Sequence, residues 1–241
     1  MNDFIFSKSK INTFIQCPRQ FKYKYIDELE DEPNEYMELG LIVHDLAETI
    51  GKNIQDGLVD VDGISELVYN MRFDTDFDLE PHFMSLACFF IDILNNGYKI
   101  FSVEEKISNP NDHFRGIIDI VLEDKDGDLI IFDYKTSKKT KPITKYRLEL
   151  CIYKNLLEYK YPDKKVTTAG IFFTHNNDYR VVNFTDDTDC GAYITTQDYE
   201  YVLSLPEKIL SFMAEDVYLP KRQFNCKFCY FADKCMEEGG F

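Results

Sequence analysis

The chain has 241 residues, of which 44% are hydrophobic and 15% aromatic, and its formal net charge is −16. This length predicts one large domain, and the apolar content is enough to fill a core. No run of about eighteen apolar residues is present, which excludes a membrane-spanning helix of the usual kind. The first residues are polar and acidic rather than basic and then apolar, so we expect no signal peptide and a cytoplasmic, intracellular protein.

The acidic net charge is unusual for a protein that binds nucleic acid, because affinity for the phosphate backbone comes from lysine and arginine. Basic residues are nevertheless grouped in two places. The first group is Lys8, Lys10, Arg19, Lys22 and Lys24, and the second is Lys135, Lys138, Lys139, Lys141 and Lys145. Two interpretations stay open, a basic groove on an acidic body or two solvated faces without a ligand.

Residues 1–98 are predicted to be mainly helical. Cys17 lies between two short expected helices, the first capped by Ser7 or Ser9 and the second opened by Pro18. The acidic stretch 27–35 is a predicted loop. From the spacing of apolar residues, the expected helices are residues 7–16, 18–25, 36–53, 64–72 and 81–98.

Residues 99–190 are predicted to form a sheet core, because Ile, Val and Phe recur there at strand spacing. Thr144 is predicted to cap a helix that runs to about Tyr159. The expected strands are residues 99–108, 114–123, 129–135, 166–174 and 179–184, with turns at 124–128 and 175–178. Residues 191–241 hold an expected helix over 195–214 and a cysteine-rich tail after Pro220. This order indicates a single α/β domain over 1–241 with N-terminal helices laid over a mixed sheet.

Two acidic residues lie where two adjacent predicted strands meet. Asp119 ends Gly116-Ile-Ile-Asp119, and Asp133 begins Asp133-Tyr-Lys135 after an apolar run. Asp133 and Lys135 are two residues apart, so their side chains point to the same face of a strand. Carboxylates on neighbouring strands can share Mg²⁺ or Mn²⁺, and a lysine beside them can stabilise charge on a phosphate. The plainer alternative is that these residues face solvent at strand ends.

Cysteines form a second pattern. Cys226, Cys229 and Cys235 are close together in the tail, and Cys17 is remote from them in sequence. Four thiolates can hold a zinc ion or an iron–sulfur cluster, and the spacing alone favours structural zinc. His44 is a polar residue within an apolar helical face, which suggests that it faces something polar inside the fold, although a lone helical histidine more often fills a core or surface position.

Together these motifs resemble the PD-(D/E)XK nuclease superfamily, in its RecB-like branch, over nearly the whole chain. The sequence is most similar to the iron–sulfur members, the CRISPR-adaptation exonucleases and the AddB-type nuclease domains. The family's Ser…Cys-Pro opening matches residues 7–18, its Gly-x-x-x-His matches Gly40 to His44, its Gly-x-x-Asp matches Gly116 to Asp119, and its Asp-Tyr-Lys-Thr matches Asp133 to Thr136. The family's Gln-x-x-x-Tyr becomes Glu149 and Tyr153, so its first position departs from the pattern.

The resemblance implies a restriction-endonuclease-like core with a central mixed sheet flanked by helices. It implies that a catalytic Mg²⁺ or Mn²⁺ is bound by His44, Asp119, Asp133 and the carbonyl of Tyr134. By the same resemblance Lys135 is catalytic, and Glu149 and Tyr153 belong to the catalytic set. The family's structural 4Fe–4S cluster, with zinc as the alternative, would join the N-terminal helices to the tail through Cys17, Cys226, Cys229 and Cys235.

The expected activity is hydrolysis of DNA by an exonuclease that acts on ends or single strands, with residues 138–145 on the DNA backbone. Phe14, Phe21, Tyr23 and Tyr25 are candidates for base stacking, with core packing as the alternative. A separate helicase or integrase protein is a candidate partner, and no membrane association is expected. The alternative function is a DNA-end-binding or integrase-partner module with weak or no cleavage.

Overall fold

The computed structural model describes residues 4–30, 35–189 and 191–240. Their central element is a six-stranded mixed sheet in the order β1-β2-β3-β4-β5-β6. The strands are β1 (Lys99–Asn109), β2 (Phe114–Glu123), β3 (Leu129–Lys135), β4 (Val166–Phe173), β5 (Asp178–Phe184) and β6 (Tyr193–Ile194). Neighbouring strands are antiparallel, except for the parallel pairs β3–β4 and β5–β6. A parallel pair needs a crossover, and helix α6 (Arg147–Lys160) lies in the connection between β3 and β4.

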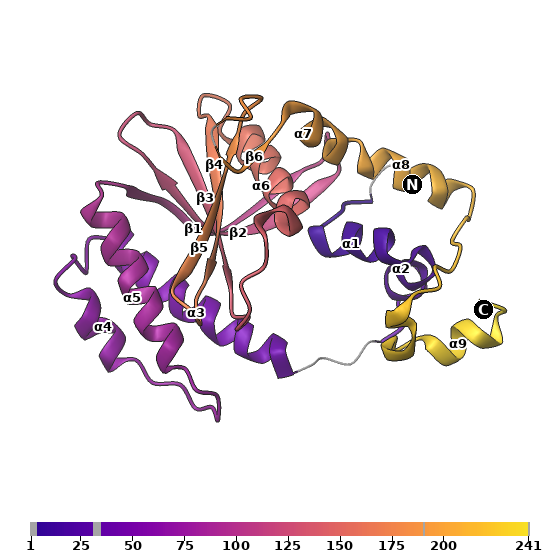
Figure 1. The fold of residues 1–241 in the computed structure, drawn as a ribbon, viewed down its shortest axis with the longest axis horizontal. Coiled ribbons are helices and arrows are strands. Elements are labelled where there is room, and N and C mark those ends of the chain that lie inside the picture. The colour runs from indigo at the N-terminus through magenta and orange to yellow at the C-terminus, as the bar shows by residue number, and fades with distance from the viewer. Residues whose placement is uncertain (1–3, 31–34, 190, 241) are drawn as a thin grey trace.

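Helices cover both faces of this sheet, as Figure 1 shows. Besides α6, the helices of the described residues are α1 (Lys8–Gln16), α2 (Pro18–Tyr25), α3 (Glu35–Gln55), α4 (Ile64–Asn70), α5 (Glu80–Asn95), α7 (Thr196–Leu203), α8 (Leu205–Ala214) and α9 (Ala232–Glu237), the last of which lies away from the sheet. This arrangement confirms the predicted α/β class and the mixed sheet flanked by helices. No helix in the described residues combines the length and apolar character needed to cross a bilayer.

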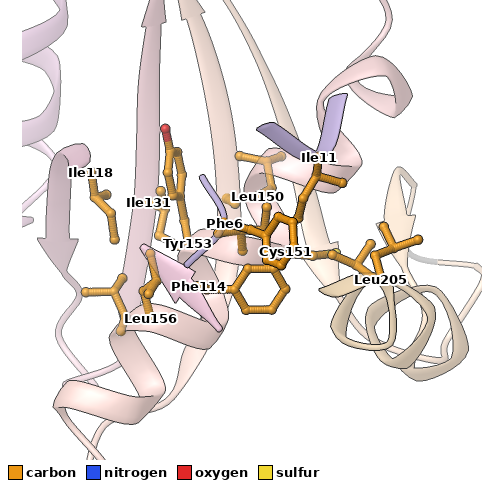
Figure 2. Close-up of a cluster of buried hydrophobic side chains, with 14 of the residues drawn as sticks. Phe6, Ile11, Phe114, Ile118, Ile131, Leu150, Cys151, Tyr153, Leu156 and Leu205 are labelled. Atoms are coloured by element: carbon orange, nitrogen blue, oxygen red, sulfur yellow. The ribbon is translucent and has the colours of Figure 1, made fainter. Parts of the chain in front are cut away.

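Two apolar cores hold these layers together, one on each face of the sheet. Helices α3 and α5 bury Leu46, Ile50 and Phe90 against Phe132 and Tyr134 of β3. On the opposite face, the core in Figure 2 packs helix α6 and the start of the chain against residues such as Ile131. Consecutive residues of β3 therefore enter opposite cores, as expected for an extended strand buried on both sides.

The sheet divides at the end of β3 that carries the predicted acidic residues. Pairing of β2 with β3 ends at Ile120 and Phe132, whereas β2 continues to pair with β1 as far as Phe114 and Asn109. The edge of β2 that β3 leaves is taken by Phe6, which forms a parallel bridge with Phe114. The Phe6 N–H donates to His113 O at 2.7 Å, and Phe6 O accepts from Arg115 N at 2.9 Å. We call the opening between β2 and β3 the fork.

Two predicted elements are wrong. Thr144 lies inside a 3₁₀ turn (Ile143–Tyr146), and α6 begins afterwards without a side-chain cap. Ile143 and Tyr146 both pack against the core, and the three-residue period of a 3₁₀ turn places them on one side. The helix expected over 195–214 is two helices, because Pro206 has no N–H to continue a helix and instead lies in the first turn of α8.

The remaining predicted helices and strands agree with the structure to within a few residues. The two-residue strand β6 was not predicted. Within the expected loop 27–35, residues 31–34, which include Pro33, lie outside the described residues, and Glu35 already begins α3.

Candidate active site

The fork brings Asp119 and Asp133 together from adjacent strands. Extending the β2–β3 register by one step places these residues opposite each other, just beyond the last paired residues. There the Asp119 carboxylate replaces a backbone carbonyl as hydrogen-bond acceptor for β3, because its Oδ2 accepts from the Tyr134 backbone N–H at 2.7 Å. Both acids are almost fully buried, at 5% and 2% exposure. The alternative that these are solvent-facing residues is therefore wrong, because buried carboxylates need a charged or hydrogen-bonding partner.

On the α3 side of the fork, three oxygen or nitrogen ligands converge. Nδ1 of His44 lies 3.3 Å from Asp119 Oδ1 and 3.6 Å from Glu104 Oε1. In the part of the chain that the structure describes, only these three residues place three potential metal-binding atoms within 4.8 Å of one another. Glu104 stands opposite Asp119 in the β1–β2 register, and its backbone φ is +47°. A left-handed glutamate within a strand is strained, and such strain tends to occur at functional sites.

On the α6 side of the fork, lysines and carboxylates form a connected network. Lys135 Nζ pairs with Asp133 and lies 3.2 Å from Glu149 Oε1. The same Glu149 oxygen pairs with Lys8 of α1. The hydroxyl of Tyr153 donates to Asp133 Oδ1 at 3.3 Å. In Figure 2 this hydroxyl points away from Leu156. Glu149 and Tyr153 are four residues apart on α6 and therefore share one helical face.

The geometry explains why position 116 is a glycine. A Cβ atom at Gly116 would lie 2.9 Å from Leu156 Cδ1 and 3.3 Å from the ring of Tyr153. Helix α6 therefore packs directly on the backbone of β2, which keeps the Tyr153 hydroxyl within reach of Asp133.

The charges at the fork shift the pKa values of its acids. Burial and the neighbouring charge of Asp133 raise the pKa of Asp119 to about 6, and the same two causes raise the pKa of Glu149 to about 7. Burial acts in the same direction on Asp133, but Lys135 and Lys8 outweigh it and hold that pKa below its ordinary value. The site therefore contains more closely placed negative charge than its lysines neutralise.

Without a bound metal ion, neighbouring carboxylates favour the protonated forms of His44 and Lys135, and binding of a cation at His44 would release the proton of that imidazole. Burial lowers the pKa of His44, but hydrogen bonds with Asp119 and Glu104 outweigh it and raise that pKa to about 10. Burial also opposes the charge of Lys135, yet Asp133 and Glu149 raise its pKa above the ordinary value. A lysine held as a cation cannot accept a proton, but it can stabilise negative charge.

The residues on the α3 side fit a hard divalent cation. Ligand atoms about 2.1 Å from Mg²⁺ in octahedral geometry lie about 3 Å apart, close to the distances from His44 Nδ1 to the Glu104 and Asp119 oxygens. Two carboxylates and an imidazole suit Mg²⁺ or Mn²⁺, and such an ion would neutralise the excess negative charge at the fork. These observations support a metal site at this point.

Apart from the four cysteines, the structure brings the side chains predicted for the site to the fork, with two additions. Glu104 and Lys8 were not predicted as site residues. Asp133 is outside the three-residue ligand group, and its carboxylate faces Lys135 and Tyr153. Metal binding by Asp133 and by the Tyr134 carbonyl stays a prediction.

The four cysteines predicted as ligands lie around one pocket of about 280 Å³. Cys17, at the α1–α2 junction, accepts a hydrogen bond from Lys221 N at 3.5 Å, and Cys226 Sγ accepts one from Gln223 N at 3.3 Å. Burial and the charges of the other cysteines raise the pKa of Cys235. In Figure 1 the tail with α9 lies beside α2, so the two distant parts of the chain meet at this pocket.

The two predicted basic groups differ in the structure. In the first group, Lys8, Arg19 and Lys22 form ion pairs with Glu149, Glu238 and Asp216. In the second, Lys138, Lys139, Lys141 and Lys145 are exposed beyond β3.

The candidate stacking residues in the N-terminal segment belong to the interior. Phe21 and Tyr23 are buried, and Phe14 and Tyr25 pack against the same core as Phe21. Core packing is therefore the correct alternative for this aromatic set.

Comparisons with known proteins agree with this fold. No curated protein sequence matches the chain. A crystal structure from Eubacterium rectale, of a protein provisionally named an exonuclease, is similar over 97% of this chain and 88% of that one, at 13% sequence identity and a TM-score of 0.54. The crystal structure of SSO0001 aligns over 97% of this chain and 86% of that one, at 14% identity, but its TM-score of 0.38 is too low to support an argument.

The family assignment comes from the sequence itself. Residues 5–236 match the model of the PD-(D/E)XK nuclease superfamily, a stretch that includes the fork and all four pocket cysteines. Nucleases of this kind use divalent metals, in agreement with the group formed by His44, Glu104 and Asp119. The chain belongs to the PD-(D/E)XK nuclease superfamily.

Proposed function

We propose that this protein is a DNA exonuclease that requires Mg²⁺ or Mn²⁺ and acts on DNA ends or single strands. The observation that carries the proposal is the meeting of two residue sets at the fork. His44, Glu104 and Asp119 form the metal-binding side, and Asp133 and Lys135 form the side next to them. A metal site beside a protonated lysine is suited to hydrolysis of a phosphate ester.

A bound metal ion would polarise the phosphodiester and lower the pKa of a water molecule. The side chains of the fork would position the phosphodiester and the water molecule. Lys135 remains protonated, so it can stabilise the charge that develops on the phosphate and orient the attacking water. Glu149 and Asp133 fix the Lys135 ammonium from two sides, and Tyr153 holds the Asp133 carboxylate through its hydroxyl. Lys8 keeps Glu149 paired, which links α1 to the site.

The exposed lysines that follow β3 support DNA as the substrate. Lys138, Lys139, Lys141 and Lys145 come directly after the Asp133–Thr136 segment, and the structure leaves them open to solvent. Lysines in this position can neutralise backbone phosphates near the site even though the whole chain is acidic.

We further propose that Cys17, Cys226, Cys229 and Cys235 hold a structural 4Fe–4S cluster. Four sulfurs bound to one zinc ion at about 2.3 Å would lie about 3.8 Å apart. No three of these four sulfurs lie within 4.8 Å of one another, since the only group of that kind in the described residues is at the fork. The wider spacing and the pocket of about 280 Å³ support a group larger than one ion. Visible absorption and iron analysis of anaerobically purified protein would distinguish the cluster from zinc.

End-labelled single-stranded and double-stranded DNA, each also in circular form, would test the proposal. With Mn²⁺ or Mg²⁺ the protein is expected to shorten linear DNA progressively and to leave circular DNA intact. Asp119→Asn should abolish this activity, and Lys125→Ala, a change in the exposed β2–β3 turn, should not alter it. Cleavage of circles would instead indicate an endonuclease. Tight binding to DNA ends without cleavage would favour the end-binding or integrase-partner module.

A further inference from the structure

The tail carries exposed aromatic rings, of which Phe228 also lines the cysteine pocket. Phe224 and Phe228 are each 74% exposed, and Tyr230 is 55% exposed. The centroids of the two phenylalanine rings lie 6.0 Å apart. Other aromatic residues form the buried cluster of this region, in which Tyr23 and Phe231 pack with Cys235. Neighbouring apolar rings left in water commonly mark a binding surface.

The same stretch of chain is basic within an acidic protein. Residues 217–231 contain Lys221, Arg222 and Lys227 and no acidic residue, whereas the whole chain has a net charge of −16. All three basic residues are exposed. Lys227 Nζ lies 3.9 Å from the ring centroid of Phe224 and 4.8 Å from that of Phe228, so its charge is placed between the two rings. The surface therefore alternates rings and cations.

This surface is joined to the fork through helix α1. Gln223 Nε2 donates to Gln16 O at 3.2 Å, and Lys221 Nζ donates to Ile15 O at 3.3 Å, both at the C-terminal end of α1. Lys8 at the other end of α1 pairs with Glu149 at the fork. The eight residue steps along α1 correspond to about 12 Å. A strand several nucleotides long could therefore touch both places.

We infer that the surface formed by Phe224, Phe228, Arg222 and Lys227 binds single-stranded DNA. Bases stack on the two rings, and the two cations neutralise neighbouring phosphates. Stacking on aromatic side chains tolerates any base, because every base has a flat π-face. Basic residues between the rings match the backbone of a strand better than they match an apolar protein surface. The inference rests on the proposed nuclease function in one respect, because that function makes the bound strand a substrate.

Binding without cleavage tests this inference directly. Fluorescein-labelled oligothymidylate is titrated with the full chain in the absence of added divalent cation, and fluorescence anisotropy reports the dissociation constant. Phe224→Ala and Phe228→Ala should each weaken binding by about 5- to 100-fold. Tyr69→Ala, which removes a ring of 76% exposure on α4, should leave the affinity unchanged. Visible absorption and the melting temperature of each variant verify that the cysteine pocket is intact.

Three further double variants separate stacking from other causes. Phe224→Leu with Phe228→Leu keeps an apolar surface but removes the flat faces, so it should bind as poorly as the alanine pair, Phe224→Ala with Phe228→Ala. The corresponding Trp pair should bind at least as well as wild type. Arg222→Ala with Lys227→Ala should reduce the slope of log affinity against log salt by about 1.4, at about 0.7 per phosphate contact. Lys125→Ala should not change that slope.

The outcomes distinguish this inference from the nuclease proposal. Wild-type affinity in the leucine pair with loss in the alanine pair would overturn stacking and indicate apolar docking of a protein. Unchanged affinity in all ring variants, with normal cleavage of DNA, would refute DNA binding by this surface and leave the nuclease proposal standing. Ring-dependent binding by a protein that cleaves no DNA would support DNA binding by this surface and refute the nuclease proposal.

Discussion

The fork and the tail both gather side chains that can bind metal, but different forces position them. At the fork, the residues lie on β1, β2, β3, α3 and α6, and two large buried cores fix these elements. In the tail, the buried cluster consists of Tyr23, Phe231 and Cys235. The difference teaches that the fork can be formed by folding alone, whereas the tail gains much of its order from whatever its cysteines bind.

Removing the lysine of the fork should have the largest effect. Lys135→Ala is expected to lower the rate of cleavage by about 100- to 1000-fold, because a fixed positive charge next to the reacting phosphate is lost. Lys8 still pairs with Glu149, so the fold should persist. Single-turnover cleavage and circular dichroism would measure the two effects. Wild-type cleavage in this variant would refute the role of Lys135.

Removing a cysteine from the tail should lower the stability of the protein as well as its activity. In Cys229→Ala, a loss of about 3 kcal/mol would lower the melting temperature by about 6–12 °C. The tail should become sensitive to proteases while the sheet keeps its circular dichroism signal, and activity should fall. Cys88→Ala, on α5 and away from the pocket, is the matched control. An unchanged melting curve for Cys229→Ala would contradict the idea that the pocket clamps the two ends.

Glu104 and Glu105 are adjacent in sequence, but of the two only Glu104 belongs to the candidate metal site. Glu104→Gln should weaken Mn²⁺ binding by about 10- to 100-fold, since a charged oxygen beside the ion is lost. Glu105 pairs instead with Lys160 and Tyr161, so Glu105→Gln should leave Mn²⁺ affinity nearly unchanged and alter only stability. Isothermal titration with Mn²⁺ would compare the two variants. Equal affinities would remove Glu104 from the metal site.

The smallest effect concerns a buried histidine outside both regions. Nδ1 of His82 is 2.7 Å from Thr174 Oγ1, and burial together with the charge of His175 lowers the pKa of His82 to about 4. An unfolded histidine has a pKa near 6.5, so the unfolded chain gains a proton first as the pH falls. Stability should therefore decrease between about pH 6.5 and pH 4. The decrease should be about 1–2 kcal/mol after allowance for solvent in the pocket that His82 and His175 line.

Chemical denaturation across this pH range would test the effect. The His82→Asn variant should lack this part of the pH dependence, because it removes the titrating group. Parallel stability profiles for the variant and the wild type would show that His82 does not titrate as described.

The sequence predicted the β2–β3 hairpin and the positions of Asp119, Asp133 and Lys135 well, because alternation and turn residues are local signals. The resemblance to the family pointed to Glu149 and Tyr153, which the structure locates at the fork. Glu104 was missed because two adjacent glutamates in a strand do not reveal which one turns inward.

Tertiary contacts account for most of the other differences between the predicted and the observed structure. Lys8 reaches Glu149 across 141 residues, and local spacing cannot show such a contact. Thr144 was assigned as a cap because its residue type favours that position, but packing of Ile143 and Tyr146 decides the local turn. Pro206 is itself a local signal for the break between α7 and α8, since proline interrupts a helix interior.

The bridge between Phe6 and Phe114 has a practical consequence for handling this protein. Because Phe6 occupies the edge of β2 and Lys8 follows two residues later, a fusion partner attached close to this segment would pull on the same backbone that positions Glu149. A purification tag placed there without a long spacer could lower activity with no change in the metal-binding residues. Tag position is therefore a variable to control before any mutant is compared with the native chain.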